Sequence, residues 1–160
     1  MHAELLTDQH LQNDTMGKIN NLFAGLAGAV ALNVLHNALK NKPDTPRIDF
    51  LGEQALQKTV RCFGGNITDT DKLYEATLAG DIVSNTIYYS LIASAKPGYI
   101  WPKAVTMGLI AGIAAVKLPE PLGLNPKPVA KTDQKKALTI GYYVFGALVT
   151  ALIASALKRQ

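Results

Sequence analysis

The chain has 160 residues, of which 48% are hydrophobic and 18% charged, and its formal net charge is +4 at pH 7. The basic residues occur singly beside apolar runs, without a basic stripe or stacking aromatic residues, so the charge does not indicate nucleic-acid binding. The single cysteine, Cys62, excludes an intrachain disulfide framework and a cysteine-based metal site.

Two long runs without Asp, Glu, Lys or Arg indicate the class of protein. Residues 19–39 and 137–157 each form such a run of 21 residues, close to the ~20 that a helix needs to cross a hydrocarbon core. We therefore predict an all-α, polytopic integral membrane protein. The expected architecture is a four-helix up-down transmembrane bundle in a single domain, with an additional amphipathic helix. A soluble bundle of buried helices is the alternative.

The chain begins with a polar segment, residues 1–18, for which a short surface helix and disorder both remain open. It does not resemble a cleaved signal peptide, so the first span, residues 19–39, is predicted to be a retained anchor. Near the end of this span, Asn33, His36 and Asn37 follow the spacing i, i+3, i+4. Such polar side chains are costly in a membrane unless they face protein or water.

Residues 45–63 have apolar and polar residues at helical spacing and predict an amphipathic helix. Thr45 is the expected N-cap, Pro46 fits the first helical position, and Gly64 with Gly65 ends the helix. This helix is expected either to lie flat in the headgroup layer or to dock against the bundle.

Residues 69–95 predict one long helix of ~40 Å, started by Thr68 and Asp71 as a cap. From residue 82 onward the segment carries no charge, and it is interpreted as span two. Asp81 and Asn85 lie at the border of this apolar part, one turn apart on one face. Four further polar residues of this helix extend the face into a polar stripe: Tyr74, Thr77, Ser84 and Tyr88. A carboxylate so placed needs a partner or water.

Span three, residues 104–117, is expected to be short, because only 13 residues separate its flanking lysines. A re-entrant helix is the alternative for this segment. Ala104, Gly108 and Gly112 recur every fourth residue, which predicts tight packing against a neighbouring helix.

A proline-rich connection that contains Glu120 follows, and Thr132 is the expected cap before span four, residues 137–157. Of the 16 Lys and Arg residues, eleven lie in the two long connections and five on the opposite side. The positive-inside rule then places the long connections in the cytoplasm and both termini outside. The expected location is a bacterial inner membrane.

In an up-down bundle, odd spans end on the side where even spans begin, so the unusual polar residues converge at one membrane face. They form the predicted ligand-binding site: Asn33, His36, Asn37, Asp81, Asn85, Tyr88 and Glu120. The candidate catalytic residues are His36, Asp81 and Asn85, because a carboxylate that accepts a hydrogen bond from an imidazole raises its basicity. Alternatively, His36 and Asp81 bridge helices structurally.

Two classes of function follow. The first is a structural or accessory subunit, or a module that binds a lipid or small molecule, with membrane lipid and a second copy or another membrane protein as partners. The second is a membrane-embedded enzyme or proton-coupled carrier acting on a lipid-like substrate. The small-residue faces favour the first class. No metal is expected, because the spans hold a single histidine, and the sequence indicates no particular cofactor.

Overall fold

The computed structural model describes the backbone of residues 2–159 and the side chains of residues 15–159. Its elements in chain order are α1 (His2–Leu39), α2 (Ile48–Cys62), α3 (Thr70–Ala93), the 3-10 helix η1 (Pro97–Tyr99), α4 (Ile100–Lys117), α5 (Lys127–Ala130) and α6 (Asp133–Leu157). Residues 2–159 contain no strand, so the predicted all-α class is confirmed.

Within the described residues, three segments are long and apolar enough to cross a membrane: Thr15–Leu39, Pro97–Lys117 and Asp133–Leu157. The helix α4 begins at Ile100, before the expected start of span three at residue 104. Lys103 lies inside the first turn of α4, so the apolar segment reaches 21 residues. The helix α3 falls outside this group because polar residues, Asp81 and Asn85 among them, lower its hydropathy.

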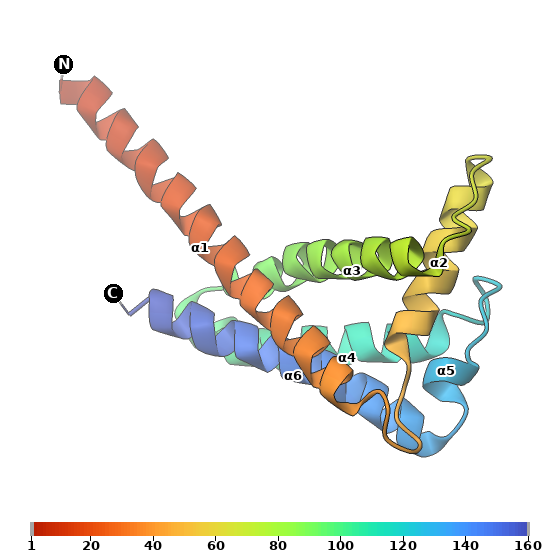
Figure 1. The fold of residues 1–160 in the computed structure, drawn as a ribbon. Coiled ribbons are helices and arrows are strands. Elements are labelled where there is room, and N and C mark those ends of the chain that lie inside the picture. Colours follow the sequence, from red (N-terminus) through yellow and green to blue (C-terminus); the bar gives the residue numbers. More distant parts are fainter. Residues whose placement is uncertain (1, 160) are drawn as a thin grey trace.

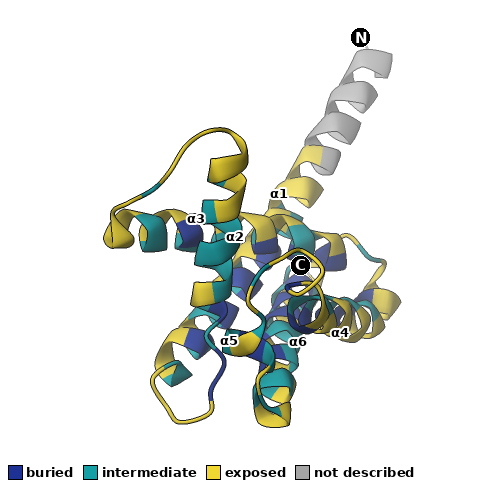
Figure 2. Ribbon diagram, turned by 90° about the vertical axis from the view of Figure 1, so that its right-hand side faces the viewer, coloured by how far each residue is buried: buried dark blue, intermediate teal, exposed yellow. Residues whose placement is uncertain are grey.

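Four long helices pack side by side, with α1 against α3 and α6 and with α4 against α6 (Figure 1). Their buried residues lie on the faces turned toward one another, whereas exposed residues cover the outside (Figure 2). Large apolar side chains occupy much of this outer surface. On α3, for example, Val83, Ile87 and Leu91 are 59%, 57% and 50% exposed.

Glycines bring α6 into close contact with both α1 and α4, and we call these contacts the glycine seams: Gly28, Gly108, Gly112 and Gly146. A Cβ on Gly28 would collide with the Thr150 hydroxyl and lie 2.5 Å from the Gly146 carbonyl oxygen. A Cβ on Gly112 would lie 2.6 Å from the Ile140 Cα. The predicted tight packing of span three is thus found, and its neighbour is α6.

The helices α2 and α5 lie at the end of the molecule where α1 ends and α3 begins (Figure 1). Here α2 docks against α3 and α5, and the Arg47 amide donates to the Pro128 carbonyl at 3.0 Å. On the outer side of α2, Lys58 Nζ donates to the Leu122 carbonyl at 2.6 Å. These bonds tie α2 to the proline-rich connection.

Two of the three expected caps are wrong. The Thr45 hydroxyl donates to the Lys42 carbonyl instead of capping α2, which begins at Ile48. Asp69, one residue after the expected Thr68, caps α3 by accepting from two backbone amides. Both errors have one reason, since a cap depends on the path by which the chain enters the helix. Thr132 caps α6 as expected.

Candidate functional site

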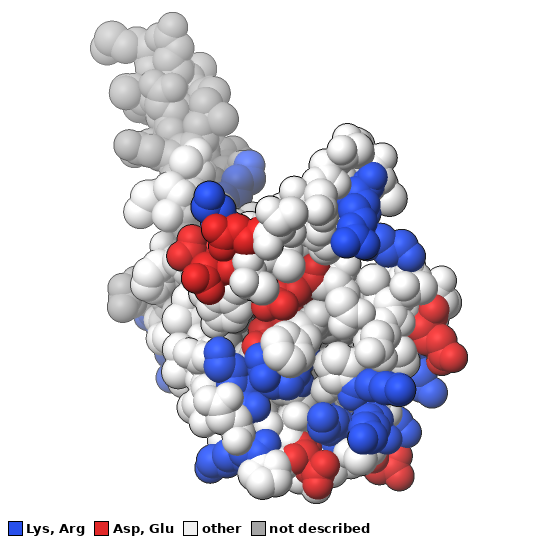
Figure 3. Space-filling model, turned by 45° about the vertical axis from the view of Figure 1, so that its right-hand side comes forward, with Lys and Arg blue, Asp and Glu red and all other residues white. Residues whose placement is uncertain are grey.

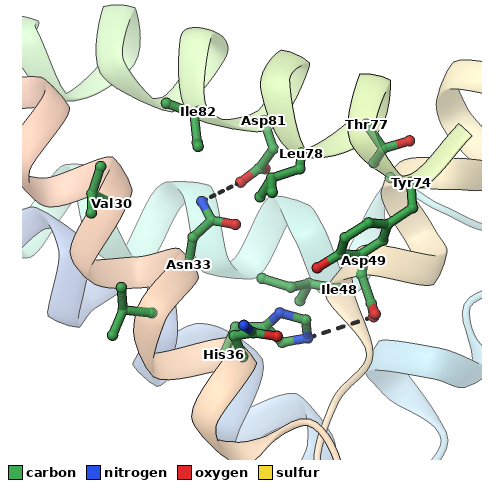
Figure 4. A pocket seen from close by; sticks show the side chains of 13 residues that line it. Val30, Asn33, His36, Ile48, Asp49, Tyr74, Thr77, Leu78, Asp81 and Ile82 are labelled. Atoms are coloured by element: carbon green, nitrogen blue, oxygen red, sulfur yellow. Dashed lines mark hydrogen bonds and ion pairs between the residues drawn. The ribbon is translucent and has the colours of Figure 1, made fainter. Parts of the chain in front are cut away.

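A pocket of about 230 Å³ lies between α1, α2 and α3 (Figure 4). The helices α1 and α3 touch at Gly25, where a Cβ would lie 2.8 Å from the Ser90 amide nitrogen. From there they separate toward the end of α1, and α2 covers the resulting space (Figure 1). Its walls are mainly apolar but include carboxylate, imidazole, amide and hydroxyl groups.

The Asp81 carboxylate lines this pocket and is held by two asparagine side chains. Asn33 Nδ2 donates to Oδ2 at 2.7 Å, and Asn85 Nδ2 donates to Oδ1 at 2.9 Å. Asn33 also donates to the Ala29 carbonyl at 3.0 Å, which fixes the amide. Within the described part of the chain, no Lys, Arg or His nitrogen lies within 4.0 Å of Asp81. Neutral amides alone therefore stabilise this carboxylate.

The predicted pairing of His36 with Asp81 is wrong, because another carboxylate faces the imidazole. His36 Nε2 lies 3.5 Å from Oδ1 of Asp49, which α2 contributes (Figure 4). His36 is 4% exposed, and its ring lies edge-on to Tyr142 of α6, with 6.1 Å between the ring centroids. The imidazole thus joins α1, α2 and α6 at the base of the pocket.

Asp49 is held by a neighbouring guanidinium. Arg47 Nε and Nη2 both donate to its carboxylate, with Nη2 at 2.7 Å from Oδ2. Burial by itself would raise the pKa of Asp49, but the hydrogen bonds from Arg47 and the charge of His36 lower the pKa below its ordinary value. Burial, and then repulsion by Asp49, raises the pKa of Glu53. Asp49 is therefore an ionised and already neutralised member of the site.

Two buried polar atoms at the pocket have no hydrogen-bond partner, namely Thr77 Oγ1 and His36 Nε2. Thr77 is 8% exposed and lies one turn before Asp81 on the same face of α3. Burying a hydroxyl without a partner costs free energy. A bound molecule with a polar group is one way to satisfy both atoms.

Lys40, near the end of α1, is directed to the aromatic ring of a pocket residue and not to the carboxylates. Lys40 Nζ lies 5.1 Å from the Tyr74 ring centroid and 3.4 Å from its hydroxyl. In the space-filling view, acidic side chains lie in a hollow of this face, and basic side chains surround the lower side of the hollow (Figure 3). The lining of the pocket itself includes two carboxylates, Asp49 and Asp81, and no Lys or Arg.

The structure brings together only part of the predicted ligand-binding set. Asn33, His36, Asn37 and Asp81 line the pocket, and Asn85 is connected to it through Asp81. Two members lie elsewhere. Tyr88 lies nearly two helical turns beyond Asp81, outside the pocket. Its hydroxyl donates to the Met107 carbonyl at 2.9 Å and so joins α3 to α4. Glu120 is exposed in the connection after α4.

Sequence reasoning missed the contribution of α2, above all Asp49. A signal was present, because Arg47 and Asp49 flank the first residue of α2 and an acid favours the first turn of a helix. The pocket lining also includes two residues of the predicted polar stripe that were not assigned to the site, Tyr74 and Thr77.

Among the residues that the structure describes, there is no group of three or more His, Cys, Asp or Glu side chains that could hold a metal ion. No protein-family model matches the chain, and the comparisons with curated proteins and with solved structures found no match either. The function must therefore be inferred from the site itself.

Proposed function

We propose that this protein is an integral membrane protein that binds a small lipid-like or amphipathic molecule in the pocket between α1, α2 and α3. The observation that carries this proposal is the pocket wall, which combines apolar side chains with two buried polar atoms that have no hydrogen-bond partner. Ligand sites typically combine an apolar lining with a few polar groups that fix orientation.

The proposal includes α3 as a fourth membrane helix. Its second half carries no charge, and Val83, Ile87 and Leu91 form an exposed apolar stripe at spacing i, i+4, i+8. Exposed apolar stripes of this kind suit contact with lipid. With four spans, both termini lie outside and the long connections with α2 and α5 are cytoplasmic, in a bacterial inner membrane.

The glycine seams lend little support to a purely structural or accessory role. Gly28, Gly108, Gly112 and Gly146 lie against other helices of the same chain. The small-residue faces that favoured a partner subunit are therefore occupied internally. Self-association or a partner membrane protein would have to use the outer surface instead.

A second candidate, a membrane-embedded enzyme or proton-coupled carrier, is favoured by the His36–Asp49 pair at 3.5 Å in the pocket wall. An imidazole beside a carboxylate is the usual side-chain arrangement for accepting and passing on a proton. Proton uptake by proteoliposomes under an imposed pH gradient tests this role. Uptake that His36→Gln abolishes would support a carrier, and equal uptake by both proteins would exclude it.

Native mass spectrometry of the protein released from mild detergent tests the binding function. We expect one small amphipathic molecule per chain, and we expect Leu78→Trp to expel it, because Leu78 lines the pocket. Leu109→Trp is the matched control, because Leu109 is 40% exposed on α4 and does not line the pocket. A protein without a stoichiometric ligand, or a ligand that survives Leu78→Trp, would contradict the proposal.

A further inference from the structure

The charges of the pocket are unevenly balanced. Asp49 is neutralised by the forked contact with Arg47, and Lys40 is directed to the Tyr74 ring. Asp81 has only the amides of Asn33 and Asn85 as partners. Asp81 is half-buried, and removing a carboxylate from water without a cation is costly. The pocket thus holds one carboxylate that no cation of the described residues pairs with.

The hydrogen-bonding groups around this charge have unused capacity. A carboxylate offers about four acceptor positions, and Asp81 accepts side-chain hydrogen bonds from Asn33 and Asn85. The Thr77 hydroxyl, one turn away on the same face, is buried and unpartnered. Both residues line the pocket, and their unused acceptor capacity suits a ligand group that carries several N–H donors and a positive charge.

The remaining wall is apolar and sets the size of the ligand. Val30, Leu78 and Ile82 line the part of the pocket beside Asp81 (Figure 4). A cavity of 150 Å³ accommodates benzene, so about 230 Å³ holds roughly nine non-hydrogen atoms. Val34, which is 62% exposed, also lines the pocket and leaves a side opening for a longer chain.

We propose that the ligand is a primary ammonium group on a short apolar chain, with the ammonium bound by Asp81 and Thr77 and the chain lying against Val30, Leu78 and Ile82. This inference rests on the proposed binding function, because it names the ligand class of the same pocket. A neutral head would leave the carboxylate uncompensated, an anionic head would be repelled, and a bare inorganic cation would leave the apolar part empty.

The test uses the full chain in phosphatidylcholine nanodiscs, titrated at neutral pH with octylamine, octanol and octanoate, which share one chain length. Binding is followed through the side-chain amide NMR signals of Asn33 and Asn85, the two donors to Asp81. We expect octylamine to shift both signals saturably and to bind at least about tenfold more tightly than octanol, the factor expected of a charge-assisted hydrogen bond. Octanoate should leave both signals unchanged.

Two variants separate the charge from the fold. Asp81→Asn should remove the preference for octylamine over octanol while thermal unfolding without ligand remains cooperative. Glu120→Gln removes the same charge at the same end of the bundle, but outside the pocket, and should bind octylamine as the unmodified protein does. Equal affinity for octylamine and octanol, or undiminished octylamine binding by Asp81→Asn, would overturn the inference. So would the same signal shifts produced by sodium or ammonium chloride at equal concentration.

The outcomes also distinguish this inference from the function on which it rests. If octanol and octylamine bind equally and Leu78→Trp blocks both, the pocket is a binding site and only the ammonium assignment fails. If neither compound binds, both proposals fail. Replacing part of the phosphatidylcholine by phosphatidylethanolamine identifies the source of the amine. A weaker apparent octylamine affinity there indicates a lipid headgroup as competitor, and an unchanged affinity indicates a free amine.

Discussion

The glycine seams and the pocket solve the problem of helix packing in opposite ways. In the seams, a missing side chain lets backbones touch, as where a Cβ on Gly146 would lie 2.9 Å from the Gly28 carbonyl oxygen. In the pocket, α1 and α3 do not touch through their backbones and are connected by the hydrogen bond between the side chains of Asn33 and Asp81. Both arrangements occur on α1 within two turns. The difference indicates that the seams maintain the fold, whereas the pocket is free to serve a ligand.

The largest effect is expected for Gly28→Ala in a seam. The new Cβ would collide with the Thr150 hydroxyl and approach the Gly146 carbonyl oxygen, and backbone cannot move aside as a side-chain end can. We expect a loss of about 2 kcal/mol or more in the free energy of unfolding, as in an overpacked core. Thermal unfolding in detergent measures this loss.

Gly141→Ala is the matched control for this substitution. Gly141 lies in α6, and a Cβ there would have no heavy atom within 4 Å. Alanine should leave the unfolding free energy unchanged or raise it by up to ~1 kcal/mol through helix propensity. A similar loss at both positions would show that the seams are not the tight contacts that maintain the fold.

The next effect concerns the ion pair at the base of the pocket. Arg47→Gln leaves the Asp49 side chain, which is 8% exposed, without its cation, and we expect a loss of about 2 kcal/mol at pH 7. The pKa of Asp49 is lowered below 3.8 in the folded protein. The contribution of the pair is therefore fully present above pH ~4 and is lost as the pH falls through the folded pKa.

Unfolding measured between pH 7 and pH 3 should therefore show the two proteins approaching one another at the acidic end. Lys72→Gln is the control, because Lys72 is 78% exposed and lies 3.9 Å from Asp69. Such surface pairs contribute little to stability. A stability difference between the Arg47 variant and the original protein that did not shrink with acid would refute the assigned role of the pair.

The sequence could predict which residues are polar and at which end they meet, but not how they pair. Hydropathy and spacing located the helices, and the up-down argument placed Asn33, His36 and Asp81 at one end. The partner of His36 could not be derived, because it comes from α2, whose position depends on a loop and on contacts such as that of Arg47 with Pro128. The side-chain reach of Tyr88 toward α4 was likewise not visible from helical spacing.

A smaller effect on stability is expected for Asp81→Asn. The amide oxygen of the new residue can still accept from Asn33 or Asn85, and the loss of one hydrogen bond is offset by removal of a half-buried carboxylate that has no cation. The free energy of unfolding should change by less than about 1 kcal/mol. Thermal unfolding without ligand gives this value. A loss as large as that of Gly28→Ala would show that the main role of the carboxylate is to connect α1 and α3. That result would favour the structural interpretation of the polar cluster.

The smallest effect is expected for Gly52→Ala, which repeats the seam substitution in the wall of the pocket. A Cβ on residue 52 would lie 2.6 Å from the Thr77 Cγ2 methyl, the same distance as between a Cβ on Gly112 and the Ile140 Cα in a seam. Here, however, the obstacle is the end of a side chain that borders an empty space, so a rotation of Thr77 relieves the contact. We expect less than about 0.5 kcal/mol of change in the unfolding free energy, since helix propensity favours alanine.

The rotation of Thr77 in Gly52→Ala should weaken octylamine binding, because it moves the Thr77 hydroxyl. Stability and binding measured on one sample therefore separate the two regions: a seam residue controls the first, and a pocket residue controls the second.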